Sequence, residues 1–374
     1  MYCLHFKRQQ GGAALIVALL VFALASALIV GLQREFALQL QRGTNSFVAE
    51  QGWAYLRGAE SLGVVALQLD AGSDAGKDKP VDDLTELWAE EAKPFPLTEG
   101  GWLLGSLEDL QGRFNLNGLV GSAANDGAAS DPSPTENEAP GDGGAKDPLG
   151  EKKFSAAQRQ FIRLLGALEN VQVDRQQAIG IMQSVLDFID SDTRRSVNGA
   201  EDGAYERLTP PYRTSGRPLA TVSELRSVAG VTPEIYRALA PFVTVWPKAG
   251  GVLNILTASA TVLRSLPLND LLEPLSKEEG LRLVEARAAG VIFSIETFLE
   301  DAIFSGAEVG DFTALLGERS DWFLLSASVE IAERELHLYS VLERNRGSVL
   351  TRYRSQGELK STSIVKGLDQ NDGV

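Results

Sequence analysis

The densest group of side chains that could do chemistry is a run of carboxylates in the middle of the chain, SVLDFIDSDTRRSVNGAEDGAYERLTPPYR. Asp187 and Asp190 are three residues apart, so they share one face if this stretch is helical. Asp192 follows where Ser191 and Thr193 indicate that the helix is ending, and a short loop then leads to two further acidic residues, Glu201 and Asp202. Carboxylates this close repel one another unless a cation or arginines neutralise them. Their hard oxygen atoms are the ligands that Ca²⁺ prefers.

Several kinds of site are compatible with these carboxylates. A solvated helix end with Arg194 and Arg195 as counter-charges needs no ion at all. Mg²⁺ is less suited than Ca²⁺, because it demands stricter octahedral geometry and keeps more waters. The spacing does not match the twelve-residue EF-hand loop. A glycosidase-like carboxylate pair has no accompanying sugar-stacking pattern. From the residues alone, calcium and the solvated helix end both stay open.

The overall composition excludes several classes of function. The chain has 374 residues, with 35 basic and 50 acidic side chains and a net charge of −15. This acidity argues against a broad nucleic-acid-binding face, which needs clustered Lys and Arg. One cysteine, Cys3, excludes an intramolecular disulfide, and the two histidines lie too far apart in sequence for a local zinc motif. A Ser-His-Asp hydrolase is disfavoured because the G-x-S-x-G motif is absent.

The N-terminal residues determine where the protein is expected to reside. Residues 13–32 carry no charge, which is about the length a helix needs to cross a bilayer. Lys7 and Arg8 precede them and should stay in the cytoplasm, which places the rest of the chain on the outer side. A signal peptide has a shorter apolar core, and a plain anchor remains an alternative. The segment QQGGAALIVALLVFALASALIV resembles the leader of type IV pilin-like proteins, which a prepilin peptidase cleaves after glycine.

That resemblance implies cleavage between Gly12 and Ala13, so that Cys3 leaves with the leader. The mature chain would then have no cysteine and a net charge of −17, because Lys7 and Arg8 are lost. Most pilin-like proteins carry a glutamate at the fifth mature position, where it pairs with the N-terminal amine of a neighbouring subunit. Here that position is Val17. A subunit without this glutamate is compatible with the end of a filament, whereas the simpler interpretation is that Val17 only fills an apolar helix.

The remaining chain divides into segments of different pattern. Apolar residues between Phe36 and Leu69 recur at helical spacing and predict a helix of some fifty residues that continues out of the membrane. A loop with a short helix around Leu84–Ala92 should follow, then a strand over Trp102–Leu107 with Gly112–Leu116 as a candidate hairpin partner. Residues 120–150 are acidic and almost free of large apolar side chains, which predicts a disordered insertion.

Beyond the insertion, helical patterns are expected over Phe154–Leu168, Gln172–Ile189, Val222–Ala229 and Pro233–Leu239, and antiparallel strands between Asp321 and Arg354. Two helical pieces, SELRSVAGVTPEIYRALAPFV and KEEGLRLVEARAAGVIFSIETFLE, resemble helix-hairpin-helix or SAM-like modules. DNA-binding versions offer backbone N–H groups to phosphate, but Glu234 and the net charge oppose this. A membrane-anchored DNA-uptake protein therefore remains the weaker alternative to a packing or protein-interaction module.

The order of motifs makes the resemblance more specific. A pilin-like leader is followed by GRFNLN at 112–117, DFIDSD at 187–192, GAEDGAY at 199–205, PPYR at 210–213, SELRSVAGV at 223–231 and LNILTA at 253–258. This order resembles the minor pseudopilin K family of type II secretion systems over nearly the whole chain. The absent fifth-position glutamate also fits this family.

The resemblance implies an α+β fold: a long N-terminal helix packed on an antiparallel sheet, with a large all-α inserted domain that is SAM-like. The expected organisation is a leader over 1–12, a membrane-spanning part over 13–33, the first pilin-like part over 34–119, the insertion over 120–150, the all-α domain over 151–320, and the second part of the sheet with a C-terminal tail over 321–374. It also implies calcium near the acidic loop, held by Asp190, Asp192, Glu201 and Asp202, with Asp187 as a weaker candidate.

The function that the resemblance implies is structural and not enzymatic. The expected protein is a single-pass inner-membrane subunit with a periplasmic head that caps the tip of the secretion pseudopilus. Its expected partners are the minor pseudopilins I and J, then pseudopilin H, the major pseudopilin G and the prepilin peptidase, with no nucleic acid and no small-molecule substrate. The alternative from a different class is a membrane-anchored, calcium-dependent hydrolase.

Overall fold

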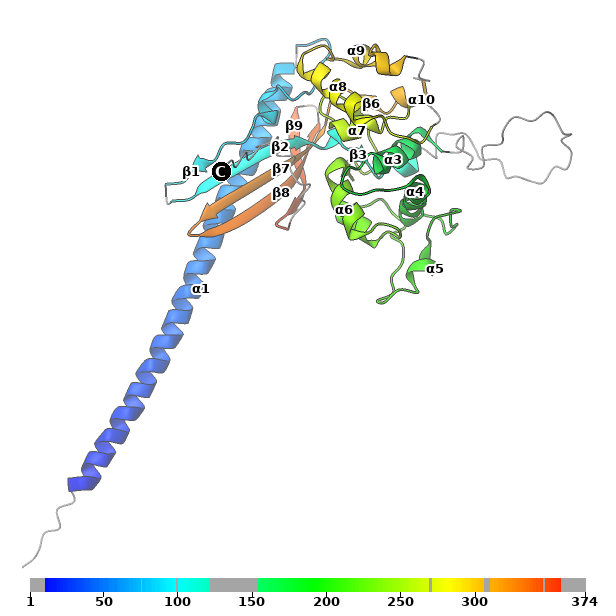
Figure 1. The fold of residues 1–374 in the computed structure, drawn as a ribbon. Helices are drawn as coiled ribbons and strands as arrows, with labels where there is room; N and C mark the ends of the chain where they lie inside the picture. Colours follow the sequence, from blue (N-terminus) through cyan, green and yellow to red (C-terminus); the bar gives the residue numbers. More distant parts are fainter. Residues whose placement is uncertain are drawn as a thin grey trace, which may run out of the picture.

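A single long helix dominates the computed structural model, which describes residues 11–74, 76–98, 100–121, 154–268, 271–305, 310–345 and 347–357 (Figure 1). Helix α1 spans Gly11–Asp74, 64 residues without interruption, which confirms the predicted helix and extends it by a turn beyond Leu69. Residues 1–10 of the expected leader, residues 122–150 of the expected insertion and residues 358–374 of the tail lie outside the described residues.

The C-terminal half of α1 packs on a five-stranded antiparallel sheet with the order β1-β2-β7-β8-β9. Its strands are β1 (Phe95–Pro96), β2 (Trp102–Asp109), β7 (Trp322–Ile331), β8 (Arg334–Asn345) and β9 (Ser348–Ser355). The predicted antiparallel strands after Asp321 are therefore confirmed. Strand β2 pairs with β7, with Leu107 opposite Leu325, so two parts of the chain more than 200 residues apart complete one sheet.

Apolar side chains and one close backbone approach hold α1 to this sheet. Leu56 and Leu67 of the helix are buried with Phe323, Leu325 and Leu338 of the strands. A Cβ atom at Gly63 would come within 2.7 Å of a Leu325 methyl carbon. Gly63, which weakens the helix in isolation, thus allows the helix and the sheet to approach closely.

The chain between β2 and β7 forms a helical region with its own apolar core, centred on residues such as Phe161, Val185 and Leu263. It holds α2 (Gly118–Gly121), α3 (Ala156–Gly166), α4 (Arg175–Ile189), α5 (Asp202–Tyr205), α6 (Pro233–Leu239), α7 (Ala260–Arg264), α8 (Lys277–Ala288), α9 (Ile295–Leu299) and α10 (Gly310–Thr313). The 3₁₀ turns along the chain are η1 (Leu87–Ala89), η2 (Leu110–Gly112), η4 (Val222–Ser227), η5 (Ala240–Phe242) and η6 (Ala302–Phe304).

Three expectations about local structure need correction. The segment Gly112–Leu116 is not a hairpin partner of β2: Phe114–Asn115 forms β3, which pairs in parallel with β4 (Val243–Thr244). A second short parallel pair joins β5 (Leu253–Asn254) to β6 (Leu316–Gly317), so the helical region also contains extended pairs. The helices expected at Leu84–Ala92 and Val222–Ala229 are only 3₁₀ turns, whereas Pro233–Leu239 is helical as predicted.

Buried polar contacts join the helical region to the sheet. The Asp109 carboxylate, at the end of β2, accepts hydrogen bonds from Asn254 Nδ2 (3.1 Å), Thr257 Oγ1 (2.5 Å) and Ser320 Oγ (2.6 Å). Desolvation of this fully enclosed group raises its pKa to about 6. Because Asp109, Asn254 and Ser320 come from three separate segments, the network fixes where the helical region starts and ends on the sheet.

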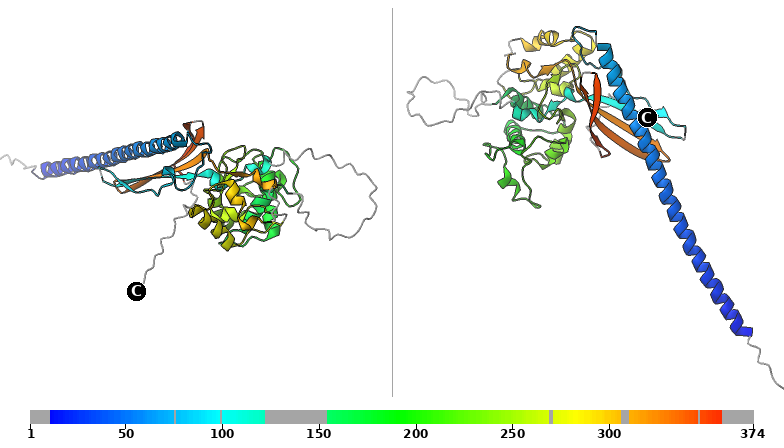
Figure 2. Two further views of the ribbon diagram at one scale, coloured as in Figure 1. Left: turned by 90° about the horizontal axis from the view of Figure 1, so that it is seen from above. Right: turned by 180° about the vertical axis from the view of Figure 1, so that it is seen from behind.

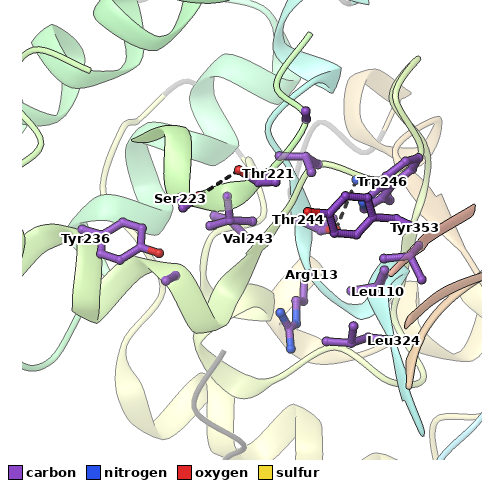
Figure 3. Close-up of a pocket in the computed structure, with 15 residues that line it drawn as sticks. Leu110, Arg113, Thr221, Ser223, Tyr236, Val243, Thr244, Trp246, Leu324 and Tyr353 are labelled. Carbon is purple, nitrogen blue, oxygen red and sulfur yellow. Dashed lines mark hydrogen bonds between the residues drawn. The ribbon is translucent and has the colours of Figure 1, made fainter. Parts of the chain in front are cut away.

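Aromatic rings also connect the two parts. The rings of Trp246, from the helical region, and Trp322, from β7, are stacked with their centroids 5.1 Å apart. Near Trp246, a cavity of about 70 Å³ is lined by side chains from both parts, among them Val243, Trp246 and Tyr353 (Figure 3). The helical region is therefore packed against the sheet and is held beside the C-terminal half of α1 (Figure 2).

Candidate metal centre

The acidic loop begins where α4 ends. The Asp174 side chain caps the N-terminus of α4 by accepting a hydrogen bond from Gln177 N (2.8 Å), and Asp190 is the C-terminal cap residue, with extended backbone angles. The chain then continues through Asp192 in a loop that ends at Glu201. The Glu201 side chain caps α5 by accepting a hydrogen bond from Asp202 N. As a result, Asp190, Asp192 and Glu201 each place one carboxylate oxygen within 4.8 Å of the other two.

Two carboxylate oxygens of this group have no hydrogen-bond donor or positive charge beside them among the described residues. Asp190 Oδ1 and Glu201 Oε1 are buried and have no hydrogen-bond partner among the described residues. Burial, followed by repulsion from Asp192, Asp187 and Glu201, raises the pKa of Asp190 to about 6. Burial also raises the pKa of Glu201. Buried and unpaired carboxylate oxygens carry a large desolvation penalty unless a positive charge meets them.

Asp187 has a different role from the other carboxylates. It is 1% exposed and accepts hydrogen bonds from Ser196 N (3.2 and 3.1 Å) and Ser196 Oγ (2.6 Å). Any Cβ atom at Gly199 would overlap the Asp187 carboxylate, so only glycine fits this position. Asp187 therefore holds the loop against α4 and lies outside the group of three oxygens.

Asp202 also lies outside that group. Its Oδ1 accepts hydrogen bonds from Thr214 N and Thr214 Oγ1, both at 2.9 Å, and these bonds lower its pKa. Asp202 thus closes the segment between residues 202 and 214. Of the five carboxylates that the sequence singled out, the structure brings three together, and it engages the other two in contacts that shape the loop.

The geometry of the three oxygens fits a hard divalent cation. An ion about 2.4 Å from each of two oxygens on opposite sides would separate them by about 4.8 Å, which is in the range of calcium sites. The unpaired atoms of Asp190 and Glu201 are the observation that favours a cation over a solvated helix end. Loop carbonyls and water would complete the 6–8 ligands that Ca²⁺ takes.

A second acidic group was missed by the sequence reasoning. Asp70, at the end of α1, lies near Asp82 and Glu86 of the following loop. Here the neutralising charge is present: Arg344, 1% exposed, pairs with Asp70 Oδ2 (2.6 Å) and with Asp82 Oδ1. Burial raises the pKa of Glu86 to about 7. Arg344 lies more than 250 residues away in sequence, so the pattern around Asp70 gave no sign of it.

The glycine hairpin of the DNA-binding alternative has a carboxylate at its helix start, and the nearby Arg237 is paired with that carboxylate, Glu234 (3.2 Å). Gly230 adopts the left-handed conformation (φ 84°), and Thr232 caps α6 by accepting from Ile235 N. Glu234 stands exposed in the first turn of α6. A carboxylate at this position opposes the binding of phosphate to the helix N-terminus.

The N-terminal half of α1 is apolar and exposed. Within the described part of the chain, α1 alone has an apolar window long enough to cross a membrane, and none of that window is buried. Gly12 and Ala13, the expected cleavage site, lie in its first turn, and Val17 is 60% exposed further along it. Cleavage at this site stays a prediction.

Comparison with known proteins agrees with this architecture. Family models described as "Type II secretion system (T2SS), protein K" match residues 112–248 and 253–319. The type II secretion system protein K of Pseudomonas aeruginosa is 30% identical over 94% of both chains, and that of Pectobacterium carotovorum is 28% identical over 96% of this chain and 99% of its own.

A solved structure shares the fold. One chain in the crystal structure of the GspK-GspI-GspJ complex from enterotoxigenic Escherichia coli superimposes with a TM-score of 0.62, at 25% identity, over 85% of this chain and 99% of its own length. The shared long helix and antiparallel sheet agree with the family matches. The chain belongs to the type II secretion system protein K family.

Proposed function

We propose that this protein is a minor pseudopilin that assembles with the minor pseudopilins I and J and caps the tip of the secretion pseudopilus. The observation that carries the proposal is the match over 85% of the chain to a structure solved as a GspK-GspI-GspJ complex. In this role α1 anchors the subunit in the inner membrane by a single pass. Lys7 and Arg8 stay in the cytoplasm and the head lies in the periplasm.

The outward face of α1 supports assembly through this helix. Outside the membrane segment, its exposed large apolar side chains are Phe36, Leu38, Leu40, Phe47, Leu62, Val65 and Leu69. At about 100° per residue, all of these except Leu38 fall within an arc of about 80°. We call these six residues the outer stripe. The stripe faces away from the side of α1 on which Leu56, Gly63 and Leu67 meet the sheet. It suits the apolar helices of neighbouring pseudopilins.

Two features support a position at the tip. After cleavage by the prepilin peptidase, Val17 would stand at the fifth mature position, where it offers no carboxylate to the N-terminal amine of a subunit ahead. The helical region also projects sideways from the sheet and widens the head beyond the pilin-like part (Figure 2). A wide head at the outer end would block the addition of a further subunit. Pseudopilin H and the major pseudopilin G would then lie behind it.

The helical region would serve as a packing module. Its sequence resembles SAM-like and helix-hairpin-helix modules around Gly230, but Glu234 opposes a phosphate ligand. The acidic loop would hold a structural calcium ion through Asp190, Asp192 and Glu201, while Asp187 and Asp202 hold the loop in shape. Nothing in this role requires catalysis, and the protein acts by assembly and not as an enzyme.

Co-purification with partner subunits tests the proposal. The full chain is co-expressed with pseudopilins I and J of the same bacterium, solubilised in detergent and purified through a tag on this chain. We expect both partners to be retained, and Leu62→Glu/Val65→Glu, which places two charges on the outer stripe, to reduce their recovery at least tenfold.

A matched variant controls for added charge. Gln68→Glu/Ser61→Glu adds two charges at exposed positions of α1 that lie outside the outer stripe, and it should leave recovery unchanged. Equal recovery of the partners with the unsubstituted chain, the stripe variant and the control variant would show that the outer stripe is not the interface. Absence of both partners from the unsubstituted chain would contradict the proposed function itself.

A further inference from the structure

Strand β2 is only partly paired along its outer edge. All eight of its residues pair with β7, whereas β1 pairs with Trp102 and Leu103 alone. In the part of the chain that the structure describes, no backbone hydrogen bond beyond the ladder with β7 reaches Gly105 or Leu107. Figures 1 and 2 show β1 on the side of the sheet away from the helical region, which therefore leaves this edge uncovered.

The register shows which backbone groups of β2 face this open edge. Phe95 lies opposite Leu103, and Pro96 lies opposite the residue before it. Because Pro96 has no N–H, the pair that exchanges hydrogen bonds between β1 and β2 is Phe95 and Leu103. Backbone groups alternate in direction along a strand, so the N–H and C=O groups of Gly105 and Leu107 point the same way as those of Leu103. These four groups are therefore free to pair with a further strand.

An apolar groove lies along the same edge. It has a volume of about 410 Å³ and is lined by α1, by residues 103–107 of β2 and by the segment that leads from η1 into β1. Three large apolar side chains that line it are exposed: Leu62 (68%), Leu87 (58%) and Phe95 (64%). Apolar side chains gathered in one groove mark a binding surface. Leu62 also belongs to the outer stripe, so the groove is continuous with that surface.

The rim of the groove carries more negative than positive charge. Glu90, Glu91 and Lys93 line it and are exposed. Neither carboxylate has an ion-pair partner among the residues that the structure describes. A basic side chain of an incoming segment would therefore find a carboxylate at this rim.

We propose that an extended segment of a neighbouring minor pseudopilin pairs with the open edge of β2 and places alternate apolar side chains in this groove. The unpaired N–H and C=O groups of Gly105 and Leu107 specify the occupant, because their spacing matches the backbone of another strand. Every second side chain of such a strand would point toward α1, and a flanking Lys or Arg would meet Glu90 or Glu91. The inference rests on the proposed function, because a subunit packed on the outer stripe is the one that lies beside the groove.

Two substitutions at Gly105 test the pairing of the backbone. Gly105→Pro removes the outward N–H and leaves the ladder with β7 intact, and proline is tolerated at such an edge. Gly105→Ala keeps the N–H, and its Cβ atom would lie 3.8 Å from the Ala59 Cβ atom, an ordinary contact. In the co-purification with pseudopilins I and J, we expect Gly105→Pro to reduce the recovery of a partner at least threefold and Gly105→Ala to leave it unchanged. An equal loss with Gly105→Ala would assign the effect to the side chain and overturn the proposal.

Photo-cross-linking decides the case even where Gly105→Pro unfolds the sheet. The cross-linker p-benzoylphenylalanine replaces Phe95 in the groove or, as the control, Leu350, which is 46% exposed in β9 at the opposite edge of the sheet. We expect position 95, and not position 350, to cross-link to pseudopilin I or J, with the attached segment identified by mass spectrometry. A cross-link from position 95 to residues 358–374 of this chain or to a second copy would identify a different occupant and overturn the proposal, as would equal cross-linking from both positions.

Charge reversal at the rim completes the test. Glu90→Lys/Glu91→Lys should reduce the recovery of a partner severalfold, whereas Glu278→Lys/Glu285→Lys makes the same change at exposed positions of α8 and should not. Equal losses would reduce the effect to net charge and overturn the proposal. Full recovery of both partners with Gly105→Pro would refute pairing at β2 and leave the proposed function intact. Absence of both partners from the unsubstituted chain would instead refute the proposed function, and this inference with it.

Discussion

At the scale of single residues, the acidic loop depends on the protonation of Asp190. Its pKa is raised to about 6, first by burial and then by the neighbouring carboxylates. When folding raises the pKa of a carboxyl group, the protonated group favours the folded state. This contribution is lost as the pH rises from the pKa of the unfolded state through the pKa of the folded state. Without calcium, the group therefore favours the folded state more at pH 5.5 than at pH 7.5. With calcium, protons compete for the same oxygens, so calcium affinity should fall as the pH falls through 6.

The melting temperature of the full chain checks this pH dependence. In EDTA we expect it to be higher at pH 5.5 than at pH 7.5, and 1 mM CaCl₂ should raise it mainly at pH 7.5. Glu86 and Asp109 have pKa values raised to about 7 and 6 and contribute in the same direction. Asp190→Asn isolates the loop, because it should reduce the pH dependence in EDTA and abolish the response to calcium. An unchanged response to calcium in this variant would contradict the assignment.

A second residue-scale prediction separates a ligand from a residue that shapes the loop. Asp192→Ala should weaken calcium binding at least tenfold, about 1.4 kcal/mol, because it removes one of three converging oxygens. Asp202→Ala removes an equal charge, but its Oδ1 bonds to Thr214, so calcium affinity should fall by less than threefold. Isothermal titration calorimetry measures both, and equal losses would show that Asp202 is a ligand after all.

At the scale of elements, what could be predicted depended on how local the determining contacts are. The apolar periodicity of α1, α3 and α4 lies within each segment, so these helices follow from the sequence. The partner of β2 does not, because it is β7, separated by the whole helical region. The acidic loop was likewise visible as a local cluster, whereas the contact of Asp202 with Thr214 and the pairing of Arg344 with Asp70 required the fold.

Arg344 gives the corresponding prediction for the elements that it joins. Its guanidinium connects β8 to Asp70 of α1 and to Asp82, and donates to Ser320 O (2.6 Å). Arg344→Ala would leave two buried carboxylates unpaired, and it should lower the free energy of unfolding by about 3–5 kcal/mol. Arg352→Ala, in the neighbouring strand β9, breaks the partly exposed pair with Glu343 of β8 and should cost less than about 1 kcal/mol. Urea denaturation followed by tryptophan fluorescence measures both, and similar costs would contradict the structural role of Arg344.

At the scale of the whole molecule, two faces of one long helix serve different purposes. One face of α1 holds the sheet, and the opposite face carries the outer stripe into solvent. The helical region extends the head on the far side of the sheet (Figure 2). In the proposed function, the apolar helix would join this subunit to an assembly and the wide head would end it.

The position of the protein along a pseudopilus tests this account most directly. Cys3 is the chain's single cysteine and lies in the predicted leader, so Ala288→Cys, at an exposed position in the last turn of α8, gives the mature chain one thiol for a gold label. Pseudopili sheared from cells that carry this variant are imaged by electron microscopy. A capping subunit predicts a single label at one end of each filament. Labels spaced along the filament shafts would contradict it.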